Sequence, residues 1–157
     1  MDYFESFGIN IDKGKYHEEA IYSIALLYNL FDDKISAYLK DFDLSIGKLN
    51  VLVSIRHQGG EKGISQVDIS KHLIVSPANM TKLLDKLEEE GLVYRQAHKD
   101  DRRVNMIKIS PKGIQLLDRL WPGYQKELEG LASRLMRQEQ KTLSALLRKW
   151  VGLLVNN

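Results

Sequence analysis

Two serine–proline pairs constrain the fold of this chain more strongly than any other feature of its sequence. Ser76-Pro77 and Ser110-Pro111 each put a side-chain oxygen directly before a proline. Proline is favoured at the first helical position, where the N–H that it lacks would have no partner. A serine before it can accept a hydrogen bond from the first turn. The pairs therefore predict that one helix begins at residue 77 and another at residue 111.

The residues between these two starts change from a helical pattern to an extended one. Apolar residues at positions 80, 83, 84 and 87 recur at helical spacing as far as Gly91, which is suited to ending a helix in the left-handed conformation. Residues 92–95 and 104–109 then carry β-branched and aromatic side chains, and the second run alternates apolar with polar residues. We expect these runs to form a β-hairpin around the polar loop 96–103.

Helical patterns dominate the chain before this segment. Apolar residues recur at steps of three and four over residues 16–40, and a second helix is expected to start after Ser45 and to end at the glycine pair after residue 58. Ser65, with Asp68 three residues later, resembles a capping box ahead of a short helix that ends near residue 73. With two helices after the hairpin, the predicted fold is mainly α with a small β-hairpin.

The C-terminal part of the chain is expected to be helical with one interruption. Pro122-Gly123 is predicted to kink the helix that starts at residue 111 or to restart it. Apolar stripes lie at both chain ends, and a single domain of residues 44–118 cannot cover them alone. We therefore expect residues 1–40 and 120–157 to form a helical dimerisation region.

Charge indicates a nucleic-acid partner only weakly. The net charge of the whole chain is +2. Between residues 66 and 112 there are nine Lys and Arg residues against seven Asp and Glu residues, and the remainder is balanced. A DNA-binding face must therefore come from spatial segregation of charge within this middle segment.

The helix that starts at residue 77 has a face suited to reading DNA. On a helical wheel its four large apolar residues share one side, and the other side carries a small residue, an amide, a hydroxyl and cations, namely Ala78, Asn79, Thr81, Lys82 and Lys86. The major groove admits one helix, and base edges offer partners for amide, hydroxyl and cationic groups. The alternative is a solvated amphipathic helix with no ligand, which the wheel alone favours.

The loop of the hairpin adds a second feature of a DNA-binding protein. Lys99, Arg102 and Arg103 lie at its tip, where a wing could reach a phosphate backbone or a minor groove. A charged hairpin tip by itself only indicates solubility. A capped short helix, a capped second helix and a cationic wing in this order are together characteristic of a winged helix-turn-helix between residues 63 and 112.

Other classes of site find little support. The chain has no cysteine, which excludes disulfides, thiolate ligands and a cysteine redox switch, and its four histidines lack paired ligand spacing, so neither metal nor cofactor is expected. No cluster of an acid, a base and a nucleophile can be assembled that would indicate an enzyme. The N-terminus lacks the basic start and apolar core of a signal peptide, and no membrane-length apolar run occurs, so we expect a cytoplasmic protein that does not bind membranes.

Several segments resemble the MarR family of transcriptional regulators. Residues 65–73 are similar to the first helix of its DNA-binding motif, and residues 76–95 to its recognition helix and first wing strand. Asp101-Arg102-Arg103 followed by Ile109-Ser110 resembles its wing signature, and Leu44-Ser45 with Val51-Leu52 its preceding helix. The resemblance is specific from about residue 44 to residue 117 and only architectural outside.

The resemblance implies a repressor-like regulator that binds double-stranded DNA as a homodimer on a pseudo-palindromic operator. Its two winged heads would lie about one DNA turn apart, roughly 34–36 Å. The resemblance also implies a signal felt near the dimer interface. The lack of cysteine excludes a cysteine oxidation switch, which leaves either a small aromatic or amphipathic effector or no ligand at all. Aromatic residues could line such a pocket, although packing in the core or the dimer is the simpler interpretation: Tyr16, Tyr28, Phe31, Phe42 and Trp121.

Residues expected at the DNA follow from the wheel and from the resemblance. They are Ser65, Gln66, Ser76, Pro77, Ala78, Asn79, Thr81, Lys82, Lys86, Asp101, Arg102 and Arg103. Arg103 would enter the minor groove, held by an ion pair with Asp101. Lys82 and Lys86 stand where the family often has Arg, which removes bidentate guanine reading and leaves the base preference open. A winged-helix module that contacts proteins without reading DNA sequence is the alternative function.

Overall fold

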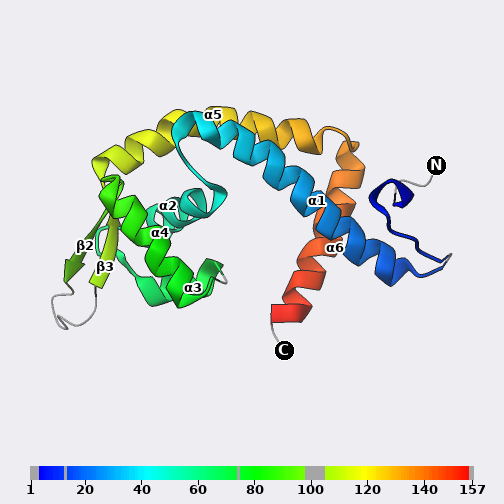
Figure 1. Cartoon of the computed structure of the whole chain (residues 1–157), viewed down its shortest axis with the longest axis horizontal. Coiled ribbons are helices and arrows are strands. Elements are labelled where there is room, and N and C mark those ends of the chain that lie inside the picture. Colours follow the sequence, from blue (N-terminus) through cyan, green and yellow to red (C-terminus); the bar gives the residue numbers. More distant parts are fainter. Residues whose placement is uncertain (1–3, 13, 74, 98–104, 156–157) are drawn as a thin grey trace.

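The computed structural model describes residues 4–12, 14–73, 75–97 and 105–155, and its elements follow the predicted order (Figure 1). Four helices precede the hairpin: α1 (Tyr16–Leu39), α2 (Ile46–Gln58), α3 (Gln66–Leu73) and α4 (Pro77–Glu89). The hairpin strands are β2 (Val93–Ala97) and β3 (Asn105–Ile109), followed by α5 (Pro111–Ala132) and α6 (Arg137–Val155). Three short elements were not predicted: η1 (Glu5–Phe7), η2 (Lys40–Phe42) and β1 (Ile64–Ser65).

The elements form an arch with a head at one end. Figure 1 shows α2, α3, α4 and the hairpin gathered into this head, while α1 and α5 run away from it along the top of the arch. Helix α6 descends at the other end of the arch. The head coincides with the segment expected to bind DNA, and α1 with α6 coincides with the expected dimerisation region. That division into regions stays a prediction, since α5 runs from one into the other without a break.

Serine side chains start three of the helices, as their positions in the sequence predicted. Ser45, Ser76 and Ser110 each accept a hydrogen bond from the backbone N–H three residues later, at 3.3, 3.4 and 3.0 Å respectively. Pro77 and Pro111 occupy the first helical positions of α4 and α5. Local capping chemistry therefore places these two helices on either side of the hairpin.

The hairpin belongs to an antiparallel sheet of three strands in the order β1-β3-β2. Strand β1 pairs Ile64 with Ile107 and Ser65 with Met106. Its two residues are too few to show an alternating pattern, so the sequence carried no signal for it. Gly63 precedes it with a φ of 80°, and a Cβ there would lie 2.8 Å from the carbonyl oxygen of Ile107. Only glycine fits this close approach of two backbones.

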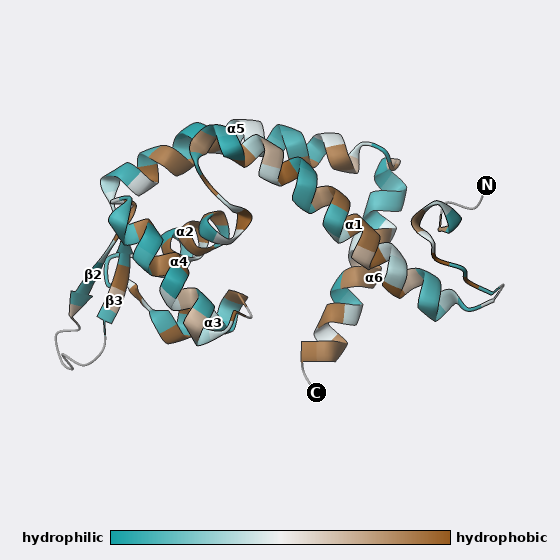
Figure 2. Ribbon diagram, viewed as in Figure 1, coloured by the Kyte–Doolittle hydropathy of each residue, from teal (hydrophilic) through white to brown (hydrophobic). Residues whose placement is uncertain are grey.

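One hydrophobic core connects the head to the arch. Leu39 of α1, Leu52 of α2, Ile69 of α3, Leu84 of α4 and Leu120 of α5 are all fully buried in it. Figure 2 shows hydrophobic segments alternating with hydrophilic ones along these helices. The core therefore holds α3 and α4 in a fixed position relative to α1 and α5.

Of the two outcomes expected at Pro122-Gly123, a restart of the helix is wrong, because α5 continues through both residues, and a kink stays a prediction. Pro122 offers no N–H to the carbonyl of Asp118 one turn earlier, but Asp118 is exposed, so water can supply that hydrogen bond. Gly123 lies against Tyr38 of α1, whose hydroxyl donates to the carbonyl of Leu120 at 2.6 Å. Packing against α1 thus supports the helix where its own backbone bonds are incomplete.

Membrane insertion finds no support in the helices. Over the described ranges, no helix combines the length and the apolar character that crossing a bilayer requires.

Candidate nucleic-acid interface

Helices α3 and α4 form the helix-turn-helix that the sequence predicted. Helix α3 ends at Leu73 and α4 begins at Pro77. The backbone N–H of Val75 donates to the carbonyl of Ser70 at 3.1 Å, which closes the chain tightly between the two helices. Leu73 and Val75 pack against the core, so the turn is held by apolar contacts as well. Position 74 lies outside the described residues.

The two faces of α4 agree with the helical wheel. Met80, Leu84 and Leu87 are fully buried, and Leu83 packs against the core. Every residue of α4 expected at the DNA is exposed, together with the Ser76 cap: Pro77, Ala78, Asn79, Thr81, Lys82 and Lys86. The prediction of an exposed polar face is confirmed. That this face contacts DNA stays a prediction for each of these residues.

Two residues that are expected at the DNA, Gln66 and Thr81, are joined by a hydrogen bond. The side-chain amide of Gln66, at the start of α3, donates to the hydroxyl of Thr81 on α4 at 2.7 Å. That hydroxyl in turn donates to the carbonyl of Pro77 at 3.0 Å. The chain of bonds ties the first turn of α3 to the second turn of α4, so the angle between the two helices is supported at their exposed edge.

Ser65 is likewise engaged within the protein. Its hydroxyl accepts from the backbone N–H of Asp68 at 3.1 Å and donates to the Asp68 carboxylate at 2.7 Å. The predicted cap of α3 is therefore present, although the carboxylate accepts from the serine hydroxyl, whereas in a capping box it would reach back to the serine backbone. Ser65 supports the start of α3 in this arrangement.

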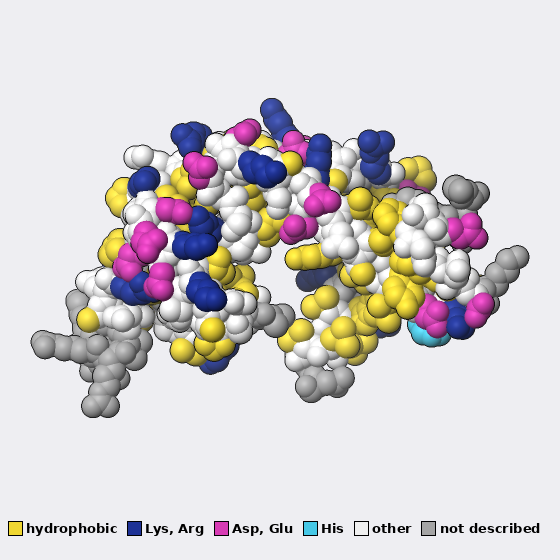
Figure 3. Space-filling model, in the orientation of Figure 1, with side chains coloured by type: hydrophobic (Ala, Val, Ile, Leu, Met, Phe, Trp, Pro, Cys, Tyr) yellow, Lys and Arg dark blue, Asp and Glu magenta, His cyan; other side chains and the backbone are white. Residues whose placement is uncertain are grey.

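The two cations of α4 have no acidic partner among the described residues, while two of its three acids are paired with a cation from another element and Glu89 is not. Lys82 and Lys86 form no ion pair with any residue that the structure describes. Asp85 and Glu88 are bound by Arg95 of β2, and Glu90, just after α4, is bound by Lys48 of α2. Figure 3 shows Lys and Arg side chains interspersed with acidic ones over the head. Pairing of the acids leaves the two lysines available to an anionic ligand.

Arg95 forms a clamp between the hairpin and α4. Its guanidinium contacts the carboxylates of Glu88 and of Asp85, the latter at 2.6 Å, and its backbone N–H donates to Glu88 at 3.1 Å. Partial burial alone would lower the pKa of Arg95, but the two carboxylates raise it more, so the pKa lies above its usual value. The clamp fixes the position of β2, the first strand of the wing, relative to α4.

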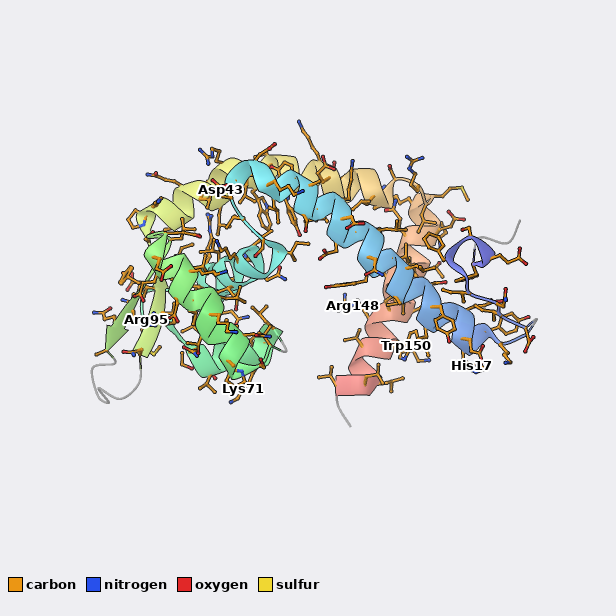
Figure 4. All side chains as sticks on the ribbon, viewed as in Figure 1. His17, Asp43, Lys71, Arg95, Arg148 and Trp150 are labelled. Atoms are coloured by element: carbon orange, nitrogen blue, oxygen red, sulfur yellow. The ribbon has the colours of Figure 1, made fainter. Side chains whose placement is uncertain are left out.

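This clamp was not predicted from the sequence, where Arg95 was considered only as part of the run 92–95 expected to form a strand. A signal existed in the spacing, because a strand that turns back after Gly91 brings residue 95 beside the last turns of α4. In Figure 4, Arg95 lies beside the hairpin, and Lys71 lies at the lower end of the head.

The wing is described only in its two strands. Val93 pairs with Ile109 at one end of the hairpin and Ala97 with Asn105 at the other, so β2 extends two residues beyond the predicted strand. The loop residues expected at the DNA, Asp101, Arg102 and Arg103, lie outside the described residues. Their minor-groove role and their ion pair stay predictions.

Alternative ligand sites are poorly developed in the described parts of the chain. No group of three or more potential metal ligands occurs there. A surface hollow of about 300 Å³ is lined by Leu92, Gln115, Leu116 and two cations, Lys112 and Arg119. Among the aromatics considered for an effector pocket, Tyr16, Tyr28 and Phe31 are exposed on α1, whereas Phe42 and Trp121 pack against the core.

Comparison with known proteins identifies the family. Residues 44–104 match the model of the MarR family. The multiple antibiotic resistance protein MarR of Salmonella typhimurium is 31% identical over 120 residues, covering 75% of this chain and 81% of that protein. The HTH-type transcriptional regulator MhqR of Bacillus subtilis is 29% identical over 126 residues, covering 80% of this chain and 84% of that protein.

Solved structures agree in fold over most of the chain. A mutant MarR from E. coli complexed with operator DNA superimposes with a TM-score of 0.79 at 26% identity, covering 88% of this chain and 98% of that one. The S. aureus MepR–DNA complex gives a TM-score of 0.76 at 26% identity, covering 83% and 95%. With its helix-turn-helix, its three-stranded sheet and these similarities, the chain belongs to the MarR family of transcriptional regulators.

Proposed function

We propose that this regulator binds double-stranded DNA in the cytoplasm as a homodimer and represses transcription from a pseudo-palindromic operator. Each copy would insert α4 into a major groove, with Ser76 to Lys86 facing bases and phosphates, while Arg103 of the wing enters the adjacent minor groove. The relatives whose structures contain DNA support the choice of duplex DNA as the ligand.

The arrangement of charge on α4 carries this proposal. Its exposed face begins with Ala78, Asn79 and Thr81 and continues with Lys82 and Lys86, neither of which has an acidic partner among the described residues. Asp85 and Glu88 of the helix are bound by Arg95, and Glu90 just after it is bound by Lys48, while Glu89 forms no ion pair with a described residue. In a solvated helix without a ligand, nothing would favour pairing acids with cations of other elements. In a helix that approaches phosphates, this pairing reduces the repulsion between the carboxylates and the phosphates.

The dimer is supported by the apolar surface of α1 and α6. Helix α6 has no buried residue, yet Leu146, Val151 and Leu154 are each about 60% exposed or more. Tyr16 and Tyr28 of α1 are likewise largely exposed. Figure 3 shows hydrophobic side chains gathered over this end of the molecule, away from the head. A second copy of the chain would cover this surface, as isologous dimers do.

Release of the DNA by a small aromatic or amphipathic effector is part of the proposal. The exposed aromatic residues of α1 lie on the surface that the second copy would cover. A pocket built from them would therefore form only in the dimer. Ligand-induced loss of operator binding, measured by titration of candidate aromatic acids into the complex, tests it.

The central experiment is a fluorescence anisotropy titration of labelled duplex DNA from the region upstream of the gene. We expect binding by a dimer, stronger than to a scrambled duplex of equal length, with affinity that falls steeply as salt rises. Sedimentation of the same samples measures the oligomeric state. Salt-independent affinity, or equal affinity for all duplexes together with an intact biological activity of an Arg103→Ala variant, would favour a protein-contact module instead.

A further inference from the structure

We propose that Asn79 selects an adenine in the major groove of each operator half-site. The A·T pair that contacts Asn79 would then contribute more to the sequence specificity of the protein than any guanine of the operator does. The inference rests on the proposed function, because it assumes that α4 lies in the groove. It adds the identity of the base that this face of α4 prefers.

Among the described residues in the first two turns of α4, only Asn79 has a side chain that carries a hydrogen-bond donor and a hydrogen-bond acceptor side by side, both without a partner. It is exposed, and only its backbone N–H is engaged, in the 3.4 Å bond to the Ser76 hydroxyl. Over the described ranges no hydrogen bond of its carboxamide is recorded. Adenine presents N7 as acceptor and N6 as donor in the major groove, and an asparagine amide pairs with both at once.

The neighbouring polar groups are committed to the protein. The Thr81 hydroxyl gives its one proton to the carbonyl of Pro77 and accepts from the Gln66 amide. The Ser76 hydroxyl caps the helix. Neither group can therefore match the paired donor and acceptor of adenine. Thr81 and Ala78 can still offer methyl groups, whose natural partner in the major groove is the C5-methyl of thymine.

Reading of guanine is correspondingly weak on this helix. Guanine is recognised best by an arginine fork, and α4 contains no arginine. Arg95, on the neighbouring strand β2, has its guanidinium held by Asp85 and Glu88. Lys82 and Lys86 carry compact charges on flexible stems, which phosphates attract at every sequence. The amide of Asn79 is thus the group best placed to distinguish one base pair from another.

The experiment uses the full-length protein and an operator obtained by selection from random duplexes. Each adenine of one half-site is replaced in turn by 7-deazaadenine, which removes the N7 acceptor and preserves base pairing. At one position we expect affinity to fall about 5- to 150-fold. The Asn79→Ala variant loses this contact in both half-sites, so it should bind the unmodified operator more weakly by about the square of that factor, and it should be insensitive to 7-deazaadenine at that position.

Lys82→Ala is the matched control, because it removes an exposed neighbour on the same helix. It should weaken binding to all duplexes, flatten the salt dependence, and keep the full sensitivity to 7-deazaadenine. The proposal is overturned if Asn79→Ala retains that sensitivity, or if 7-deazaguanine at a selected guanine has the larger effect and Lys82→Ala abolishes it. In either case the protein still binds duplex DNA and the proposed function stands. Failure to select any duplex overturns both.

Discussion

The hydroxyl of Tyr38 on α1 lies directly over Gly123 on α5, so closely that a Cβ at residue 123 would be 2.4 Å from the hydroxyl oxygen and 2.9 Å from the ring. The same hydroxyl donates to the carbonyl of Leu120 at 2.6 Å. The contact joins α1 and α5, the two helices that run along the top of the arch, one residue beyond the proline in α5.

Gly123→Ala is expected to lower the free energy of unfolding by about 1–3 kcal/mol, because the methyl group must displace the Tyr38 ring. This loss outweighs the gain of about 1 kcal/mol that alanine brings to a helix interior. Urea unfolding followed by circular dichroism measures the change. Gly130→Ala is the matched control, since nothing lies within 4 Å of its added Cβ in the same helix, and it should be neutral or stabilising. Equal stability of the two variants would contradict the packing role of Gly123.

Arg95→Ala is expected to weaken operator binding about tenfold, while the protein loses about 1–2 kcal/mol of stability from the broken bonds to Glu88 and Asp85. The substitution leaves the carboxylates of Glu88 and Asp85 without their cation, next to the face of α4 that is expected to contact phosphates. It also removes the bonds that hold β2 to α4. Anisotropy titration measures the affinity. Arg56→Ala breaks the exposed bond of 2.7 Å to Asp118 between α2 and α5 and serves as control. Should both variants bind DNA like the parent, the clamp has no part in binding.

Lys86→Ala is expected to reduce the steepness of log affinity against log salt by about 0.9 per phosphate contact, hence by about 1.8 for a dimer. The reason is that each lysine that reaches a phosphate releases condensed counterions when it binds. Titrations at several salt concentrations give the slope directly. Lys126→Ala removes an exposed lysine of α5 and should leave the slope unchanged. An identical slope for all three proteins would exclude Lys86 from the phosphate contacts.

Leu146→Glu is expected to yield a monomer at micromolar concentration, because a charge would then enter the apolar surface between two copies of α6. Leu146 is 60% exposed in the single chain, so the fold of one copy should tolerate the change. Sedimentation gives the mass, and circular dichroism checks the helical content. Gln138→Glu adds the same charge at an exposed polar position of α6 and should remain dimeric. A dimeric Leu146→Glu variant would place the interface elsewhere.

Part of the fold and of the candidate site could be predicted because it depends on residues three or four apart. Ser76 and Ser110 cap the helices that follow them, and Gly91 takes the left-handed conformation after α4, with a φ of 70°. The buried and exposed faces of α4 follow from the helical period alone. Such local rules placed Asn79 and Lys82 on the exposed face without any knowledge of the tertiary structure.

The remaining features depend on contacts between residues far apart in the chain. Ile64 pairs with Ile107, the Gln66 amide bonds to Thr81, and the Tyr38 hydroxyl bonds to the carbonyl of Leu120. No periodicity encodes these partners, because each requires elements to be packed before the contact forms. The amino-acid sequence thus determined where the helices start and which side of α4 faces outward. Tertiary packing decided that α5 passes unbroken through Pro122, since Tyr38 of α1 packs there against Gly123 and donates its hydroxyl proton to the carbonyl of Leu120.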